Sequence, residues 1–196
     1  MIQDIAPHRL GNQYDPAALP EAEDYVLFFD LDSSRFFQLT AGEALPQGEF
    51  ADVRALRGSD RFSREMMFAI LTGKHLSDWY RDNRFCGRCG KAMTHSTRER
   101  AMVCACGNTV YPRIMPAVIV GVRNGEKLLL TKYRKGFAHN ALIAGFTEIG
   151  ETAEETVARE VMEEAGIRVK NITYYKSQPW GIANDLLLGF YCDLDG

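Results

Sequence analysis

Four of the five cysteines fall in one short stretch, and their spacing constrains the fold more than any other feature of the sequence. Cys86 and Cys89 form a C-x2-C pair, and Cys104 and Cys106 form a C-x-C pair after the intervening residues 90–103. Two thiolates on one tight turn can take adjacent corners of a tetrahedron around zinc, and a second turn completes the tetrahedron. Because four thiolates leave no open position on the metal, the cluster predicts a structural zinc site.

Three questions about this cluster stay open from the sequence. The second pair is one residue tighter than the usual zinc knuckle, so His95 is an alternative fourth ligand. Free or redox-active thiols are the alternative to a metal, whereas the odd cysteine count and the lack of an export signal argue against disulfides. The ribbon would serve as a spacer or as a dimer surface in an expected homodimer. Contact with nucleic acid would depend on a few basic residues, namely Arg84, Arg88, Lys91, Arg98 and Arg100.

The composition excludes several broad classes of protein. With 46% apolar and 25% charged residues the chain is typical of globular proteins, which excludes disordered and collagen-like chains. The formal net charge of −3 gives no general attraction to nucleic acid or to an anionic membrane. The apolar run over residues 117–122 is far shorter than the ~20 residues that cross a bilayer. We therefore expect a soluble, cytoplasmic protein with no membrane partner.

The order of strand-like and helix-like patterns predicts three domains. Residues 1–84 are expected to form a small α+β domain, residues 85–115 a zinc ribbon, and residues 116–196 a domain in which strands alternate with a helix. The fold class that follows is α/β (α+β). The elements expected in the first domain are strands over 25–30 and 35–39 and a helix from the N-cap Ser63 to about Asn83.

The third domain is expected to begin with a hairpin. Asn124-Gly125 between two β-rich runs is a strong signal for a type I′ turn, because both central residues of that turn need positive φ. The elements expected in this domain are strands over 117–123, 126–132, 142–146, 168–177 and 186–192 and a helix over 153–165.

The predicted helix over 153–165 carries a cluster of acidic residues. Thr152 and Glu155 form a capping box at its start, and Gly166 ends it. Its three acidic residues at i, i+3 and i+4 share one face, while the apolar residues occupy another. An ordinary solvated acidic face is the alternative, but carboxylates this close favour a hard divalent cation between them. The three carboxylates are those of Glu160, Glu163 and Glu164.

Residues 145–167 resemble the Nudix box, G-x5-E-x7-R-E-U-x-E-E-x-G-U, in which U is a bulky aliphatic residue. All of its fixed positions match, and they are Gly145, Glu151, Arg159, Glu160, Val161, Glu163, Glu164, Gly166 and Ile167. The resemblance implies a hydrolase with an α/β/α sandwich that cleaves a nucleoside diphosphate linked to another group. Its implied Mg²⁺ or Mn²⁺ ligands are Glu160, Glu163, Glu164 and the carbonyl of Ala144, with Arg159 paired to Glu151 to orient the helix.

A zinc ribbon ahead of the box and Ser177-Gln178-Pro179-Trp180 after it are similar to the NADH pyrophosphatase subfamily. Members of this subfamily split NAD(H) into nicotinamide mononucleotide and AMP, and some remove NAD caps from RNA. The resemblance implies that Tyr111 and Phe146 sandwich a substrate ring, that Glu99 contacts substrate, and that Gln178 and Trp180 set specificity. Core packing is the alternative for each aromatic residue.

The chain departs from the subfamily in two ways. The motif S-Q-P-W-P-F-P-x-S continues here as residues 181–185, Gly-Ile-Ala-Asn-Asp, so a broader hydrolase acting on substrates such as ADP-ribose is an alternative. Residues 116–196 are also fewer than a whole Nudix domain, which predicts a domain that is incomplete at its C-terminus. A weakly catalytic zinc-ribbon module that binds nucleotides is therefore a third possibility.

Overall fold

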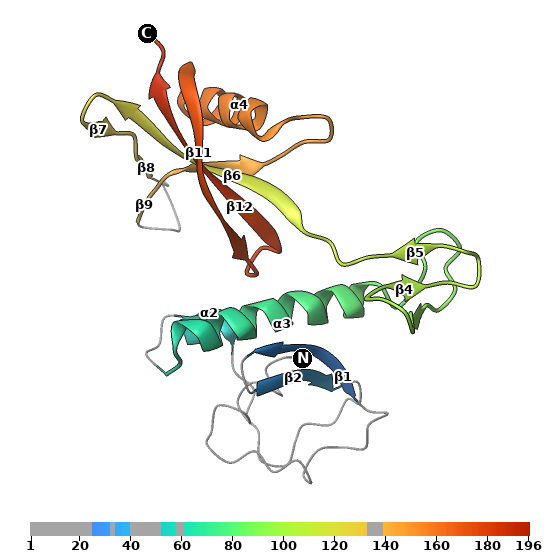
Figure 1. Cartoon of the computed structure of the whole chain (residues 1–196). Coiled ribbons are helices and arrows are strands. Elements are labelled where there is room, and N and C mark those ends of the chain that lie inside the picture. Colours follow the sequence, from blue (N-terminus) through green and yellow to red (C-terminus); the bar gives the residue numbers. More distant parts are fainter. Residues whose placement is uncertain (1–24, 32–33, 40–51, 58–60, 133–138) are drawn as a thin grey trace. The chain divides into compact units, whose positions relative to one another are not determined.

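The computed structural model describes residues 25–31, 34–39, 52–57, 61–132 and 139–196 (Figure 1). The chain divides into two compact units, Met1–Arg113 and Ile114–Gly196. The finer division into three domains at 1–84, 85–115 and 116–196 stays a prediction. None of the helices in the described residues is long and apolar enough to cross a membrane.

The first unit begins with an antiparallel pair of strands and a long helix. Strand β1 (Tyr25–Leu31) pairs with β2 (Ser34–Leu39), and the short helix α2 (Val53–Arg57) precedes α3 (Arg64–Asp82). The hydroxyl of Ser63 accepts a hydrogen bond from the Met66 amide at 3.2 Å, so the predicted N-cap is confirmed. One cluster of buried side chains in this part consists of Phe36, Val53, Ala69 and Ile70.

The cysteine-rich segment forms a small three-stranded antiparallel sheet within the same unit. Its order is β3 (Thr94–His95), β4 (Met102–Val103) and β5 (Thr109–Val110). A second buried cluster joins this sheet to the C-terminal end of α3. Its members are Trp79, Cys86, Met93, Met102 and Cys104.

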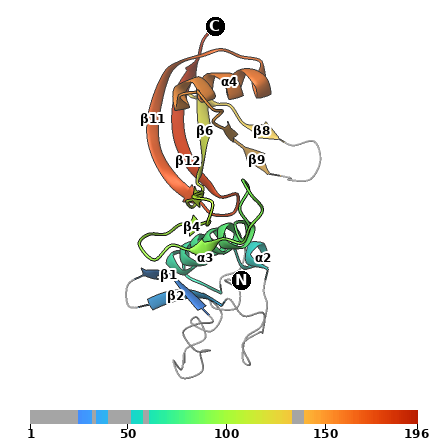
Figure 2. The ribbon, with the colours of Figure 1, turned by 90° about the vertical axis from the view of Figure 1, so that its right-hand side faces the viewer.

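The second unit is a mixed sheet with one helix packed on it (Figure 2). The strand order is β10 (Ile143–Phe146), β6 (Met115–Asn124), β12 (Asp185–Leu194) and β11 (Val169–Trp180), with β7 (Lys127–Leu128) paired to the end of β6. Strands β6 and β12 are parallel, whereas the other neighbours in this sheet are antiparallel. Two further short strands, β8 (Thr131–Lys132) and β9 (Asn140–Ala141), pair with each other. The predicted mixed α/β class is confirmed.

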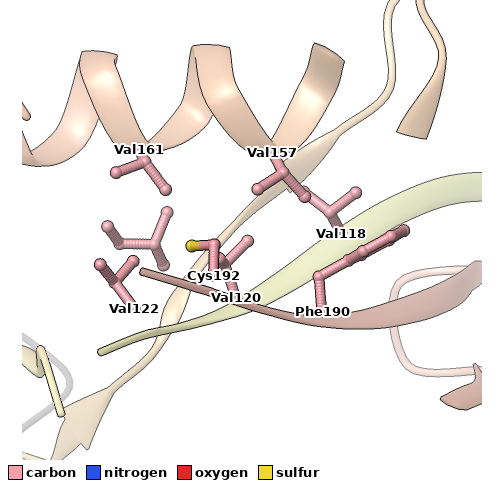
Figure 3. Close-up of a cluster of buried hydrophobic side chains, with 8 residues drawn as sticks. Val118, Val120, Val122, Val157, Val161, Phe190 and Cys192 are labelled. Carbon is pink, nitrogen blue, oxygen red and sulfur yellow. The ribbon is translucent and has the colours of Figure 1, made fainter. Parts of the chain in front are cut away.

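Alternation along the strands gives the sheet of this unit a face toward α4 and an outer face away from it. The alternate residues Val118, Val120 and Val122 of β6 point toward Val157 and Val161 of helix α4 (Ala153–Ala165), as Figure 3 shows. The other sheet residues of this core are Ile143, Phe190 and Cys192. Ala117, Ile119 and Gly121 therefore face away from α4.

The predicted hairpin turn is wrong by one residue. Asn124 pairs with Lys127, so the two turn residues are Gly125 and Glu126. Only the first of them has positive φ, +56° at Gly125. A type I′ turn would require positive φ at Glu126 as well, which its Cβ disfavours, so glycine alone carries the left-handed conformation. The strand expected over 126–132 is also interrupted between β7 and β8.

Candidate active site and metal centres

Helix α4 starts and ends where the local sequence predicts, which fixes the direction of its acidic face. The Thr152 amide donates to Glu155 Oε2 at 2.8 Å, and the Glu155 amide donates to Thr152 Oγ1 at 3.2 Å. This reciprocal pair is the predicted capping box. At the other end, Gly166 takes φ +68°, and its amide donates to the Met162 carbonyl.

A glycine on β10 makes room for one carboxylate of this face. A Cβ placed on Gly145 would lie 2.0 Å from Glu160 Cδ and 2.1 Å from Glu160 Oε1. No side chain fits at that distance, so Glu160 can lie on the strand only because residue 145 has none. The Glu160 side chain is 13% exposed in this position.

The guanidinium of Arg159 holds several acceptors around one centre. Its Nε donates to Glu151 Oε1 at 2.6 Å and its Nη2 to Glu151 Oε2 at 2.9 Å, a bidentate pair. Its Nη1 donates to Glu160 Oε1 at 2.7 Å and to Glu163 Oε2 at 3.3 Å. Its Nη2 also donates to the Phe146 carbonyl at 2.9 Å, which ties α4 to the end of β10. The expected pair of Arg159 with Glu151 is present, while its catalytic role stays a prediction.

The hydrogen-bond partners of Glu151 hold it in its ionised form. The bonds from Arg159, the amide of Glu148 and the hydroxyl of Thr156 lower the pKa of Glu151 to about 2. Its negative charge is therefore present throughout the neutral range, and the Arg159 pair persists with it.

The remaining carboxylate lies against β10. Burial raises the pKa of Glu164 and the negative charge of Glu160 raises it further, whereas a backbone hydrogen bond from Ala144 lowers it. Glu160, Glu164 and the backbone of Ala144 are thus gathered beside one strand, with Glu163 on the exposed side of Arg159. Carboxylates of like charge this close suit a hard divalent cation. Among the described residues, only the four cysteines of the ribbon have ligand atoms that already converge on one point without the ion.

The four predicted zinc ligands lie together in the first unit. All four sulfur atoms are within 4.8 Å of one another, with Cys86 Sγ 3.7 Å from Cys106 Sγ and Cys89 Sγ 3.5 Å from Cys104 Sγ. Metal–sulfur bonds of about 2.3 Å place tetrahedral sulfurs about 3.8 Å apart, so the geometry fits zinc. The tight C-x-C pair supplies both of its sulfurs. The alternative ligand His95 instead packs its ring against Tyr80, with centroids 4.9 Å apart.

Each cysteine pair lies on a turn that a glycine closes. Gly90 and Gly107 have φ of +71° and +85°, and their amides donate to the carbonyls of Cys86 and Cys104. The two turns therefore use the same backbone device although their spacing differs. None of the five cysteines forms a disulfide.

Strand register brings three predicted substrate residues to the outer face of the second sheet. Phe146 pairs with Ala117 of β6, Ala117 pairs with Leu187 of β12, and Leu187 pairs with Gln178 of β11, so these residues form one row across the sheet. Trp180 lies two residues after Gln178 and therefore on the same face. Gly145 contacts α4, so its neighbour Phe146 points away from that helix, and it is 48% exposed. Asp185, which replaces the serine of the motif, is buried and pairs with Trp180.

The two other predicted substrate residues contact each other in the ribbon. The hydroxyl of Tyr111 donates to Glu99 Oε1 at 2.9 Å. This hydrogen bond and the negative charge of Glu99 raise the pKa of Tyr111. Tyr111 belongs to the first unit and Phe146 to the second, so their pairing around a substrate ring stays a prediction.

The sequence reasoning missed Thr156, whose side chain is fully buried and donates to Glu151. The available signal was its position four residues after the N-cap Thr152, where a hydroxyl turns back toward the start of the helix.

Comparisons with known proteins agree with this arrangement. Residues 113–196 match the family described as NUDIX domain, and residues 81–111 match the family described as NADH pyrophosphatase zinc ribbon domain. A NAD-capped RNA hydrolase NudC of Enterobacter sp. (strain 638) is 46% identical over 127 residues, which cover 63% of this chain and 48% of the relative. A protein of the same name from Pectobacterium atrosepticum is 44% identical over 126 residues, with the same coverage.

The chain spans about half the length of these curated relatives. Among solved structures, a NUDIX hydrolase from Nitrosomonas europaea aligns with a TM-score of 0.50 and 26% identity, over 58% of this chain and 68% of that one. Residues 113–196 therefore form a NUDIX domain, and residues 81–111 form an NADH pyrophosphatase zinc ribbon domain.

Proposed function

We propose that this protein hydrolyses the pyrophosphate bond of NAD(H) to give nicotinamide mononucleotide and AMP, and that NAD caps of RNA are substrates of the same site. The observation that carries the proposal is that Glu160 and Glu163 both accept from Arg159, while Glu164 lies near Glu160 and the backbone of Ala144 on β10. Carboxylates that bind a divalent cation suit a substrate with phosphate groups, because the cation can bind the carboxylates and the phosphates together.

In this proposal Mg²⁺ or Mn²⁺ is held by Glu160, Glu163, Glu164 and the carbonyl of Ala144. The cation supplies neutralisation of charge on the phosphate oxygens and activation of the attacking water. The chain's own contribution is positioning. Arg159 fixes the carboxylates relative to β10, and Gly145 lets Glu160 lie close to that strand.

The substrate ring is assigned to the outer face of the sheet. Phe146 offers an exposed ring for stacking on a flat base, and Gln178 and Trp180 share its face. Tyr111 and Glu99, which lie in the ribbon, are the other residues that we propose to contact substrate. The relatives named NAD-capped RNA hydrolase support this substrate class, since the aligned region covers both the ribbon and the NUDIX domain.

One observation favours a broader substrate range. Residues 181–185 lack the two prolines and the phenylalanine of the subfamily motif, and a carboxylate, Asp185, is buried beside Trp180. Stacking secures affinity for any ring, whereas discrimination needs hydrogen bonds shaped for one partner. Hydrolysis of ADP-ribose and related nucleoside diphosphate compounds is therefore the second candidate.

The test is a nucleotide panel with Mg²⁺ or Mn²⁺, with products identified by mass. We expect cleavage of NADH or NAD⁺ at the pyrophosphate, with ADP-ribose within about tenfold in kcat/KM, or about 1.4 kcal/mol. Hydrolysis of ADP-ribose with NAD(H) untouched would favour the second candidate. Binding of nucleotides without any turnover would favour a nucleotide-binding module.

The proposal includes a setting for the protein. Zinc in the ribbon is structural, because its four thiolate ligands leave no position for substrate. Cysteines that form no disulfides are typical of a reducing compartment, so we assign the protein to the cytoplasm. We also assign it as a homodimer, which light scattering of the purified protein would test.

A further inference from the structure

The carboxylate of Glu151 accepts more hydrogen bonds than its pairing with Arg159 explains. Besides the two bonds from Arg159, Oε2 accepts from the Glu148 amide at 3.0 Å and from Thr156 Oγ1 at 3.0 Å. Four donors thus surround one side chain, and Thr156 is the only one of them that is fully buried.

The hydroxyl of Thr156 has two acceptors within reach but one proton. The second acceptor is the Thr152 carbonyl, at 2.9 Å. That carbonyl already accepts the backbone amide of Thr156 at 3.0 Å in the first turn of the helix. The hydroxyl proton is therefore available to Glu151, where a charged acceptor makes the stronger bond.

Three contacts in series connect this buried hydroxyl to the predicted metal ligands. Thr156 holds Oε2 of Glu151, Glu151 holds two nitrogens of Arg159, and Arg159 donates to Glu160 at 2.7 Å. The first of these residues is fully buried, so its position is fixed by packing. The other members are partly exposed and depend on their hydrogen bonds for their positions.

We propose that Thr156 is a positioning residue, which sets the place of the Glu151–Arg159 pair and through it the carboxylate of Glu160 for the divalent cation. This inference rests on the proposed function, because it assigns Glu160 as a metal ligand. Partners directly hydrogen-bonded to metal ligands typically change metal affinity by about 10- to 100-fold. Thr156 acts through two further bonds, so its effect should be smaller, about fivefold.

The experiment compares Thr156→Val, which keeps the shape and removes the hydroxyl, with Thr156→Ser, which keeps the hydroxyl and removes a methyl group. Mn²⁺ binding is measured without substrate, from the electron paramagnetic resonance signal of free Mn²⁺, and thermal unfolding is measured in parallel. We expect the dissociation constant for Mn²⁺ to rise about fivefold in Thr156→Val and to stay within about twofold in Thr156→Ser. If Thr156→Val does not fold, Thr156→Ala removes the same hydroxyl without adding a methyl group and should show the same rise.

A structural role alone would lower the unfolding temperature of both variants and leave Mn²⁺ affinity unchanged, which would overturn the inference. Equal losses of affinity in the valine and serine variants would overturn it too, because they would point to packing rather than to the hydroxyl. If the unaltered protein bound no Mn²⁺, the proposed function would fail, and this inference would fail with it. Normal Mn²⁺ binding with no effect of Thr156→Val would remove this inference alone.

Discussion

The two candidate metal centres assemble their ligands in opposite ways. In the ribbon, backbone turns closed by Gly90 and Gly107 bring four sulfurs together, and no cationic side chain is among their hydrogen-bond partners in the described part of the chain. On α4, side chains do this work, and Arg159 contributes a positive charge between the carboxylates. A closed set of soft ligands suits a metal that stabilises the fold. A set of carboxylate oxygens that leaves positions open on the metal suits a metal that meets substrate.

Zinc removal should give the largest effect, because the ribbon depends on its metal for folding. Zinc contributes on the order of 10 kcal/mol to the folding of small zinc domains, more than a ribbon of this size gains from its core. We expect about one zinc per chain by metal analysis and a large fall in unfolding temperature with a chelator. The absence of zinc from freshly purified, reduced protein would contradict the assignment of the four ribbon cysteines to a structural zinc site.

Neutralising the exposed carboxylates should affect catalysis strongly and folding little. Glu163→Gln and Glu164→Gln each remove a charge from a crowded face, which relieves repulsion, so the free energy of unfolding should change by about 0.5 kcal/mol or less. Their kcat should fall about 100-fold if they bind the cation. Glu154→Gln, at an exposed carboxylate in the first turn of the same helix, is the matched control. Turnover equal to that of the unaltered protein in both glutamine variants would disprove the metal assignment.

Adding one methyl group to β10 should weaken the open site without replacing any of its proposed ligands. In Gly145→Ala the new Cβ would lie 2.0 Å from Glu160 Cδ, so the carboxylate must move. We expect the Mn²⁺ concentration that gives half of the maximal rate to rise about tenfold, with the zinc content unchanged. Gly87→Ala is the control, because a Cβ there meets nothing within 4 Å. An unchanged metal dependence would show that Glu160 does not need its observed place.

The smallest effect is a pH dependence that belongs to Glu151. Because its pKa is lowered from 4.5 to about 2 in the folded protein, its stabilisation is complete above pH 4.5 and is lost as the pH falls toward 2. Denaturant unfolding of the protein and of Glu151→Gln should therefore differ by a constant amount above pH 5, and the difference should shrink below pH 4.5. A difference that stays constant down to pH 2 would mean that the Arg159 pair does not hold this carboxylate in solution.

Local signals predicted the elements well, while register and burial were out of reach of the sequence. The start and end of α4 follow from Thr152 and Gly166, since caps are read within one helical turn. The hairpin turn was misplaced because the ladder between β6 and β7 decides which residue leaves the strand. Periodicity also showed that Glu160, Glu163 and Glu164 share a face.

The spacing of the box could not show what surrounds that face. That Gly145 seats Glu160 depends on the approach of β10 to α4, which is a tertiary contact. The role of Thr156 depends on its complete burial, since an exposed threonine at this position would only bond back within the helix. Placing Phe146 in one row with Gln178 requires the register of four strands, in which β6 and β12 are a parallel pair.

The one cysteine outside the ribbon makes opening of the core of the second unit measurable. Cys192 is fully buried between α4 and the sheet, and burial raises its pKa to about 11. A thiol-specific reagent can modify it only after this core separates, because reaction requires both access and the thiolate. The rate of its alkylation therefore reports how often the second unit opens, independently of any zinc bound by the ribbon.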